Sequence, residues 1–218
     1  KSEIYEGLLS DGIALIPCED ANIATFEAAT AQLNAQTFGV ASGDVHAENI
    51  ELKPLSCEFD LVRDNERVAV VLPAPGRHNV HNAVAAAALA LAAGLSLAEV
   101  SDGLKNFSNI KGRLNIKQGI KGATLIDDTY NANPDSMKAA IDVLAAMPAP
   151  RIFVMGDMGE LGEDEAAAMH AEVGAYARDK GIEAAYFVGD NSVEAAETFG
   201  AEGLWFADKD PLIQVLSH

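Results

Sequence analysis

The pattern of apolar and polar positions changes along the first third of the chain. An apolar run at residues 12 to 17 lies between turn residues and predicts a buried strand, and an amphipathic helix is expected from Asn22 to about residue 33. From residue 37 to residue 72, apolar residues alternate with charged ones. Because side chains of a strand point alternately to its two faces, this alternation predicts a small antiparallel meander.

Two helices are predicted after the meander. Residues 77 to 93 are rich in alanine and apolar on almost every side, so this helix should be buried, and Gly94 should end it. Ser96 and Glu99 have the spacing of a capping box. The helix that they begin should end near Asn106.

A polar stretch at residues 107 to 113 predicts a hinge between two domains, 1–112 and 113–218. Beyond the hinge, short apolar runs end in a glycine or an acid and lead into helices. These strands are expected at residues 123 to 126, 152 to 155, 185 to 188 and 204 to 206. The alternation is typical of a mostly parallel sheet with crossover helices, which places the chain in the α/β class.

The first of these strands leads into the most informative candidate site. Its apolar residues, expected to be buried, are followed by Asp127 and Asp128, and Asn133 with Pro134 suits the start of a helix. Open α/β sheets hold ligands where strands end before helices, so this stretch predicts a ligand site. The alternative is that the two aspartates only solvate a loop and interact favourably with the helix dipole.

Two asparagines lie three residues apart at the start of the alanine-rich helix. Asn79 and Asn82 would project from one face, beside the exposed N–H groups of the helix start, which suits a nucleotide or another anion. The alternative is that Asn79 is the N-cap and Asn82 bonds locally. His78 and His81 share the same spacing, but no third ligand lies near them in sequence, so a metal site is not favoured.

A glycine-rich loop at residues 156 to 162 follows a strand and precedes a helix, yet it does not match GxGxxG. No GxxxxGK[ST] phosphate loop occurs in the sequence, so the phosphates of any nucleotide would not be cradled by a loop of this chain. Arg113, just after Gly112, could reach a phosphate, although a lone arginine is more often a surface residue.

Composition and charge narrow the classes of partner. With 218 residues, 49% of them hydrophobic, the chain can bury one large core or two modest ones. A net charge of -18 argues against nucleic acid as a partner, because a phosphate backbone needs a basic surface. Cys18 and Cys57 indicate neither a zinc site nor a disulfide framework. The sequence contains no apolar run long enough for a membrane span, and we expect a cytoplasmic protein.

Four segments together resemble the Mur ligase family: PGRHNVHNAVAAAALA from residue 75, GR at residue 112, DDTYNANPDSM from residue 127 and GDMGELG from residue 156. The resemblance covers the whole chain, and the last two segments are specific to the member that adds D-alanyl-D-alanine. It implies the end of a central ATPase α/β domain with a small antiparallel meander, followed by a truncated Rossmann-like C-terminal domain with a mostly parallel sheet. The family's UDP-sugar domain and phosphate loop would precede Lys1.

The resemblance also implies an activity. The family member adds D-alanyl-D-alanine to UDP-N-acetylmuramoyl-tripeptide in peptidoglycan precursor synthesis. ATP phosphorylates the peptide carboxylate and the amine of the dipeptide attacks the acyl phosphate, while Mg²⁺ screens the phosphates. We expect this chain to be inactive alone and monomeric. Two alternatives stay open: a sister ligase, which DDTYNANP fits poorly, and a non-catalytic nucleotide-binding module or dimerising scaffold.

The resemblance assigns ATP-binding roles residue by residue. Asn79 and Asn82 match the asparagines on the adenine side. Arg113 matches the hinge arginine that meets the phosphates, and Asp128 matches the aspartate that holds the ribose. Lys1 falls where the family has a lysine, carbamylated in several members, that holds a second magnesium; only the carbamate could bind the metal.

The acceptor site is expected at the carboxyl ends of the second domain's strands. The residues proposed to meet D-alanyl-D-alanine are Asn131, Asn133, Asp157 and Glu160. The reason is motif specificity, because sister ligases use the same ATP with different acceptors.

Overall fold

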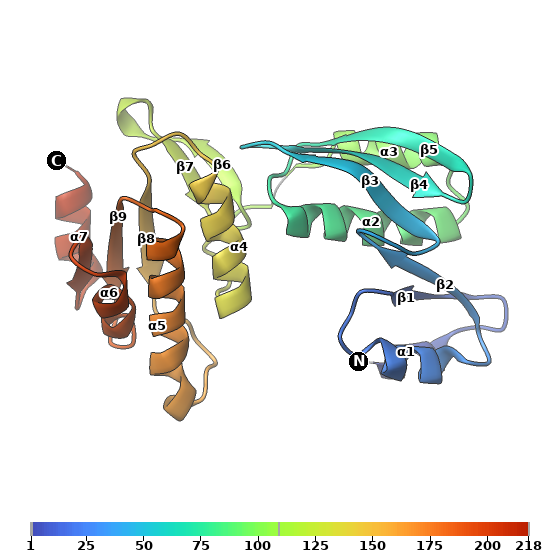
Figure 1. Ribbon diagram of the computed structural model, residues 1–218, viewed down its shortest axis with the longest axis horizontal. Coiled ribbons are helices and arrows are strands. Elements are labelled where there is room, and N and C mark those ends of the chain that lie inside the picture. The colour runs from blue at the N-terminus through green and yellow to red at the C-terminus, as the bar shows by residue number, and fades with distance from the viewer. Residues whose placement is uncertain (1, 109, 218) are drawn as a thin grey trace. The chain divides into compact units, whose positions relative to one another are not determined.

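The computed structural model describes residues 2–108 and 110–217, except for the side chains of residues 163 and 164. The chain forms two compact units, Lys1–Ser108 (unit 1) and Asn109–His218 (unit 2) (Figure 1). The division falls after Ser108, whereas the sequence pattern placed it after Gly112.

Unit 1 contains a mixed five-stranded sheet whose strands lie side by side in sequence order. They are β1 (Ile13–Pro17), β2 (Asn34–Gly39), β3 (Val45–Leu52), β4 (Cys57–Arg63) and β5 (Glu66–Leu72). The antiparallel pairing of β3, β4 and β5 confirms the meander from residue 45 onward. The expectation is wrong for residues 37 to 39, which belong to β2 and pair in parallel with β1 and β3. The alternation of apolar and charged residues shows which face of the sheet each side chain occupies. It does not show whether the neighbouring strand is parallel or antiparallel.

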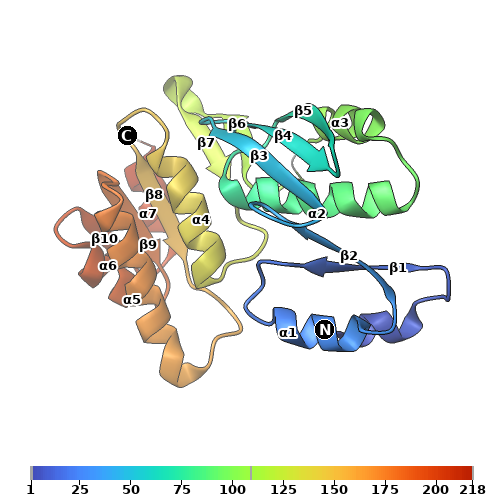
Figure 2. The same ribbon diagram turned by 45° about the vertical axis from the view of Figure 1, so that its right-hand side comes forward.

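Helices cover this sheet. They are the 3₁₀ helix η1 (Ser2–Gly7), α1 (Ile23–Thr30), α2 (Arg77–Ala92) and α3 (Leu97–Lys105). The capping box of Ser96 and Glu99 is confirmed. Figure 2 shows α2 running along the strands, and its alanine-rich face joins a core that includes Phe59 and Leu61. The helix is not buried all round as expected, because Leu89 is 64% exposed.

Unit 2 contains two sheets. The strands β8 (Ile152–Gly156), β9 (Ala184–Val188) and β10 (Gly203–Phe206) form a parallel sheet in the order β10-β9-β8, while β6 (Asn115–Gln118) and β7 (Thr124–Asp127) form an antiparallel pair. The helices are η2 (Ile120–Gly122), α4 (Pro134–Ala145), α5 (Glu163–Asp179), α6 (Val193–Phe199) and α7 (Lys209–Leu216). The core includes Met155, Val173 and Phe187.

The first strand of unit 2 differs from its prediction in two ways. β7 pairs with β6 in antiparallel fashion and has no hydrogen-bonded neighbour in the described parallel sheet. It is also not buried, because Leu125 is 52% exposed. The sequence analysis missed β6, whose four residues include a single large apolar side chain, Ile116, and are too short to show a period.

In the described chain, β7 and β8 each pair with another strand on one side only. A cavity of about 200 Å³ lies between them and is lined by Thr124, Leu125, Ile126, Asp128, Thr129, Ala132, Met137, Ala140, Leu144, Ile152, Phe153 and Val154. Asp128 therefore borders a largely apolar groove within unit 2.

None of the helices in the described ranges has both the length and the apolar character that crossing a bilayer requires.

Candidate functional site

The start of α2 places the two asparagines of unit 1. Gly76, with a φ of +92°, is the N-cap of this helix, so the expectation that Asn79 might be the N-cap is wrong. The Asn79 side chain instead turns back, and its Nδ2 donates to the Pro75 carbonyl oxygen at 2.7 Å. This bond fixes the plane of the side-chain amide. The side-chain oxygen of Asn79 therefore points away from Pro75, where it can accept a hydrogen bond.

Asn82 lies on the following turn of α2 and is exposed. Between the two asparagines, the His81 ring packs against Phe38 with their centroids 6.1 Å apart. An amide can donate and accept at the same time, which matches the paired donor and acceptor on the edge of adenine.

In unit 2, the segment around Gly112 is bonded to the end of β7. Gly112 has a φ of +78°, and its carbonyl oxygen accepts the Tyr130 N–H at 2.9 Å. An added Cβ on Gly112 would lie 3.1 Å from the Tyr130 nitrogen, so a larger residue would disturb this contact. The Arg113 guanidinium lies 4.3 Å from the centroid of the Tyr130 ring. Arg113 is thus oriented by a cation–π contact.

The two adjacent aspartates have different partners. Asp127 pairs with Lys117 Nζ at 2.5 Å and accepts the Thr129 hydroxyl at 2.7 Å. The hydrogen bond from Lys117, followed by that from Thr129, lowers the pKa of Asp127. Asp128 Oδ1 accepts the Leu114 N–H at 3.0 Å, and the contacts described for Asp128 leave its Oδ2 for a ligand.

Both asparagines of the DDTYNANP stretch bond locally through their oxygens. Asn133 Oδ1 accepts the Ser136 N–H at 2.9 Å and the Ser136 hydroxyl accepts the Asn133 N–H at 3.1 Å, so the predicted cap of α4 is confirmed, with Pro134 in its first turn. Asn131 Oδ1 accepts the Ala132 N–H at 2.9 Å. A ligand would therefore meet the amide N–H groups of these side chains.

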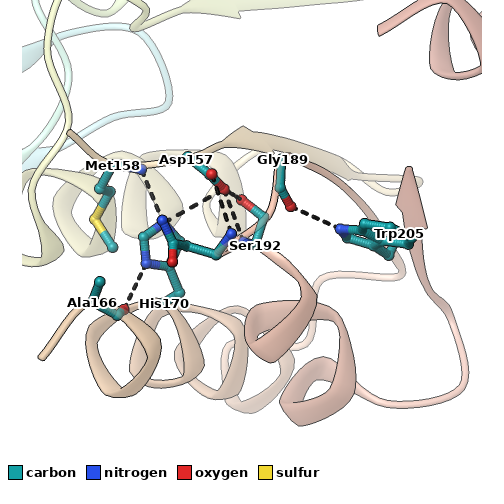
Figure 3. A network of polar contacts seen from close by, with 8 residues as sticks. Asp157, Met158, Ala166, His170, Gly189, Ser192 and Trp205 are labelled. Carbon is teal, nitrogen blue, oxygen red and sulfur yellow. Dashed lines mark hydrogen bonds and ion pairs between the residues drawn. The ribbon is translucent and has the colours of Figure 1, made fainter. Parts of the chain in front are cut away.

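Asp157 follows β8 and reaches across to the segment that follows β9 (Figure 3). Its Oδ1 accepts the Ser192 N–H at 2.8 Å and the Ser192 hydroxyl at 2.6 Å, and its Oδ2 accepts the Asn191 N–H at 3.2 Å. Gly189 passes so close that an added Cβ would lie 2.5 Å from the carboxyl carbon of Asp157. Both oxygens of this carboxylate are thus used within the fold.

Glu160 is also exposed, and its backbone has a φ of +58°. This left-handed conformation costs an L-residue other than glycine, asparagine or aspartate about 1 kcal/mol or more. The neighbouring Leu161 packs against the core of unit 2. The loop therefore holds the Glu160 backbone in a strained conformation between anchored residues.

The sequence analysis missed His170, a fully buried side chain of α5. Its Nε2 lies 2.9 Å from the Met158 nitrogen, and its Nδ1 lies 2.7 Å from the Ala166 carbonyl oxygen. Because the first partner can only donate and the second can only accept, the ring is neutral with its proton on Nδ1. In the sequence, His170 stands out only as a polar ring in an alanine-rich helix. Nothing in that pattern shows that the ring binds the Met158 N–H.

The described residues do not provide a metal site. Lys1, the candidate magnesium ligand, lies outside them. No group of three or more His, Cys, Asp or Glu side chains in the described ranges could hold a metal ion.

Comparison with known proteins identifies the class. The Mur ligase middle domain matches residues 1–90, and the domain described as "Mur ligase, glutamate ligase domain" matches residues 112–218. The chain belongs to the Mur ligase family.

Several of the similar curated proteins share one particular name, while others are named UDP-N-acetylmuramate--L-alanine ligase. The chain is 40% identical over 215 residues to the UDP-N-acetylmuramoyl-tripeptide--D-alanyl-D-alanine ligase of Escherichia coli (strain K12), covering 98% of this chain and 47% of that protein. It is 38% identical to the ligase of the same name from Haemophilus influenzae, covering 99% of this chain and 46% of that protein. The chain thus spans about half the length of these relatives.

Solved structures agree on the fold. A crystal structure of MurF from Acinetobacter baumannii superposes with a TM-score of 0.92 at 37% identity, over 100% of this chain and 47% of that one. MurF ligase from Thermotoga maritima, solved in complex with ADP, gives a TM-score of 0.79 at 21% identity, over 95% of this chain and 47% of that one.

Proposed function

We propose that this chain is part of an ATP-dependent ligase that adds D-alanyl-D-alanine to UDP-N-acetylmuramoyl-tripeptide in peptidoglycan precursor synthesis. The single observation behind this proposal is the bonding of the Gly112 segment to the end of β7, which brings Arg113 and Asp128 together. A guanidinium suited to phosphate and a carboxylate suited to ribose hydroxyls lie where strands of an α/β unit end.

In this proposal, Arg113 contacts the ATP phosphates and Asp128 holds the ribose. Asn79 and Asn82 contact adenine through their amides. ATP activates the carboxylate of the tripeptide as an acyl phosphate, and the amine of the dipeptide displaces the phosphate. Magnesium, when bound, would screen the phosphate charges. The ADP in the Thermotoga maritima structure supports a nucleotide role for this fold. We also propose that the enzyme is monomeric and cytoplasmic.

Glu160 is the proposed acceptor contact, because its carboxylate is exposed and carries the charge that attracts an ammonium group. Asn131 and Asn133 would add amide N–H groups for the carbonyl or carboxylate oxygens of the dipeptide. Lys1 stays a proposed magnesium ligand as a carbamate. Asp157 contributes indirectly, since both of its oxygens are already used.

The experiment compares Asp128 and Asp127 in the full-length enzyme. A charged hydrogen bond to a ribose hydroxyl contributes about 1.5 to 3 kcal/mol, so Asp128→Ala should weaken ATP binding by roughly one to two orders of magnitude. Asp128→Asn is the sharper variant, because its oxygen can still accept the Leu114 N–H while the charge is lost. Titration calorimetry measures the affinity.

Asp127→Asn is the matched control. Its carboxylate pairs with Lys117, so the change should alter stability slightly and ATP affinity little. Equal ATP affinities for the two asparagine variants would contradict the assignment. A full-length protein that fails to ligate D-alanyl-D-alanine would contradict the proposed activity.

A further inference from the structure

The loop after β8 is anchored at two neighbouring points, and the two anchoring side chains lie close together, with His170 Nε2 3.9 Å from Asp157 Oδ1. Above the sheet edge, Asp157 binds the backbone N–H groups of Asn191 and Ser192. On the helix side, the Met158 N–H is bound by the buried ring of His170. Figure 3 shows the two anchors meeting at consecutive residues, with α5 below them. The loop therefore leaves the sheet with its first two residues held.

The His170 anchor has a fixed polarity. The Ala166 carbonyl oxygen holds the ring proton on Nδ1, which leaves the Nε2 lone pair for the Met158 N–H. A general base or a metal ligand needs that same lone pair. His170 is therefore unsuited to either role while the loop keeps this conformation. The nearby Ser192 hydroxyl donates to Asp157 and not to His170, so these three residues do not form a catalytic triad.

We infer that His170, together with Asp157, positions the loop from Met158 to Gly162 so that Glu160 is presented to the acceptor. His170 is a positioning residue, because it touches the loop backbone and not the substrate. The inference rests on the proposed function, since the acceptor is D-alanyl-D-alanine only if the protein is that ligase. It explains how a glutamate can be held at a φ of +58°, because the loop is fastened at Met158, two residues before Glu160, and Leu161 packs directly after it.

The test uses two variants of His170 in the full-length enzyme. His170→Gln can place a carbonyl oxygen near the position of Nε2 and still accept the Met158 N–H. His170→Asn keeps a polar group near Nδ1 but is too short to reach Met158. Val173→Ala is the matched control, because Val173 is fully buried one turn farther along α5, belongs to the same core and makes no hydrogen bond to the loop.

For His170→Asn we expect the KM for D-alanyl-D-alanine to rise about tenfold, because small misplacements of a binding group weaken its contacts strongly. The affinity for ATP should not change. Amide hydrogen exchange in residues 158 to 162 should become faster. His170→Gln should recover most of the acceptor KM, and Val173→Ala should lower the Tm with both KM values unchanged.

Three results would overturn the inference: equal effects of His170→Asn on ATP and acceptor, an acceptor KM in Val173→Ala that rises as much, or unchanged exchange of the loop in His170→Asn. Failure of the proposed function is a separate outcome, read from the wild-type enzyme's inability to use D-alanyl-D-alanine. Hydrogen exchange still tests the anchoring of the loop in that case.

Discussion

Units 1 and 2 use the same device to join neighbouring parallel strands. In each unit, a carboxylate that follows one strand accepts backbone N–H groups that follow the next strand. In unit 1, Glu19 follows β1 and accepts backbone N–H groups of residues 40 to 42, which follow β2. In unit 2, Asp157 follows β8 and accepts backbone N–H groups of the segment after β9. In both units the neighbouring strand ends at or next to a glycine that has no room for a Cβ, Gly39 or Gly189.

The two devices differ in what surrounds the acid. In unit 1 no residue other than glycine between Cys18 and Asn22 has a positive φ. In unit 2 the acid is followed at once by Met158, bound by buried His170, and then by the strained Glu160. An acid at the carboxyl end of a strand is thus an architectural residue in both units. In unit 2 the proposed ligand contact is instead Glu160, an exposed acid that takes no part in these backbone hydrogen bonds.

The largest expected effect comes from breaking the device of unit 2. Gly189→Ala adds a Cβ that would lie 2.5 Å from the Asp157 carboxyl carbon, at a φ of +115°. Backbone strain and the lost hydrogen bonds together should cost about 3 kcal/mol of unfolding free energy. Urea unfolding of the full-length protein, followed by hydrogen exchange of peptides from unit 2, measures it.

Gly39→Ala is the matched change in unit 1. Its Cβ would lie 2.7 Å from Cys18 Sγ and from the Ser42 carbonyl oxygen, but no unusual φ adds strain. We expect the free energy of unfolding to fall by about 1 to 2 kcal/mol. Faster hydrogen exchange should be confined to peptides of unit 1. Equal losses in the two variants, or a larger one for Gly39→Ala, would contradict the comparison.

Replacing Glu160 by glycine should have a smaller effect on stability, and one of opposite sign. The left-handed backbone is unstrained for glycine, so the free energy of unfolding should rise by about 0.5 kcal/mol after the entropy of glycine is subtracted. The KM for D-alanyl-D-alanine should rise in the same variant, because the carboxylate is lost.

Asp64→Gly is the control for this exchange. Asp64 has a φ of +54° in the turn between β4 and β5 and is not among the proposed ligand contacts. In the Asp64→Gly variant, the free energy of unfolding should change by a similar or smaller amount, and the KM for D-alanyl-D-alanine should not change. An unchanged acceptor KM in Glu160→Gly would remove Glu160 from the acceptor site.

The smallest expected effect is a pH dependence in unit 1. Burial raises the pKa of Glu19, but the N–H groups of Ala41, Val40 and Ser42 outweigh burial, so this pKa lies below its ordinary value of 4.5. The folded state therefore gains stability above that value and loses it as the pH falls through the lowered pKa. Because Glu19 is largely exposed, the change should be a few tenths of a kcal/mol.

Glu19→Gln separates this effect from general acid sensitivity. The glutamine can still accept an N–H but does not titrate. Unfolding of unit 1, measured at neutral pH and at about pH 3, should differ less in the variant than in the wild type. If unfolding of the variant depends on pH as strongly as that of the wild type, Glu19 does not contribute to the pH dependence of stability.

Local features of this fold could be predicted from the sequence, and long-range ones could not. The caps at Ser96 and Asn133 depend on residues three positions away, so their spacing was sufficient. The partner of Asp127 is Lys117 on β6, a strand too short to show a period. The partners of Asp157 lie 34 and 35 positions away, across a strand pairing that only the folded sheet creates.

The same limit applies to the candidate site. DDTYNANP and GDMGELG point to loops at strand ends, because glycines and polar residues at strand ends are visible in a sequence. They could not separate Asp157, whose carboxylate oxygens accept backbone N–H groups of the fold, from Glu160, whose backbone has a positive φ. Resemblance selected Asp128 over Asp127, and the structure supplies a physical difference between them in the lysine that only Asp127 contacts.

The alanine face of α2 determines how unevenly this helix can tolerate mutation. Ala83, Ala87 and Ala88 are almost completely buried, so the helix backbone itself lies close to the strands. Any larger side chain there would have to push the helix outward, and Asn79 and Asn82 would move with it. Leu89, on the exposed side, has no such constraint. Amino-acid substitutions in α2 should therefore be tolerated on the exposed side of the helix, while the buried side accepts no side chain much larger than that of alanine.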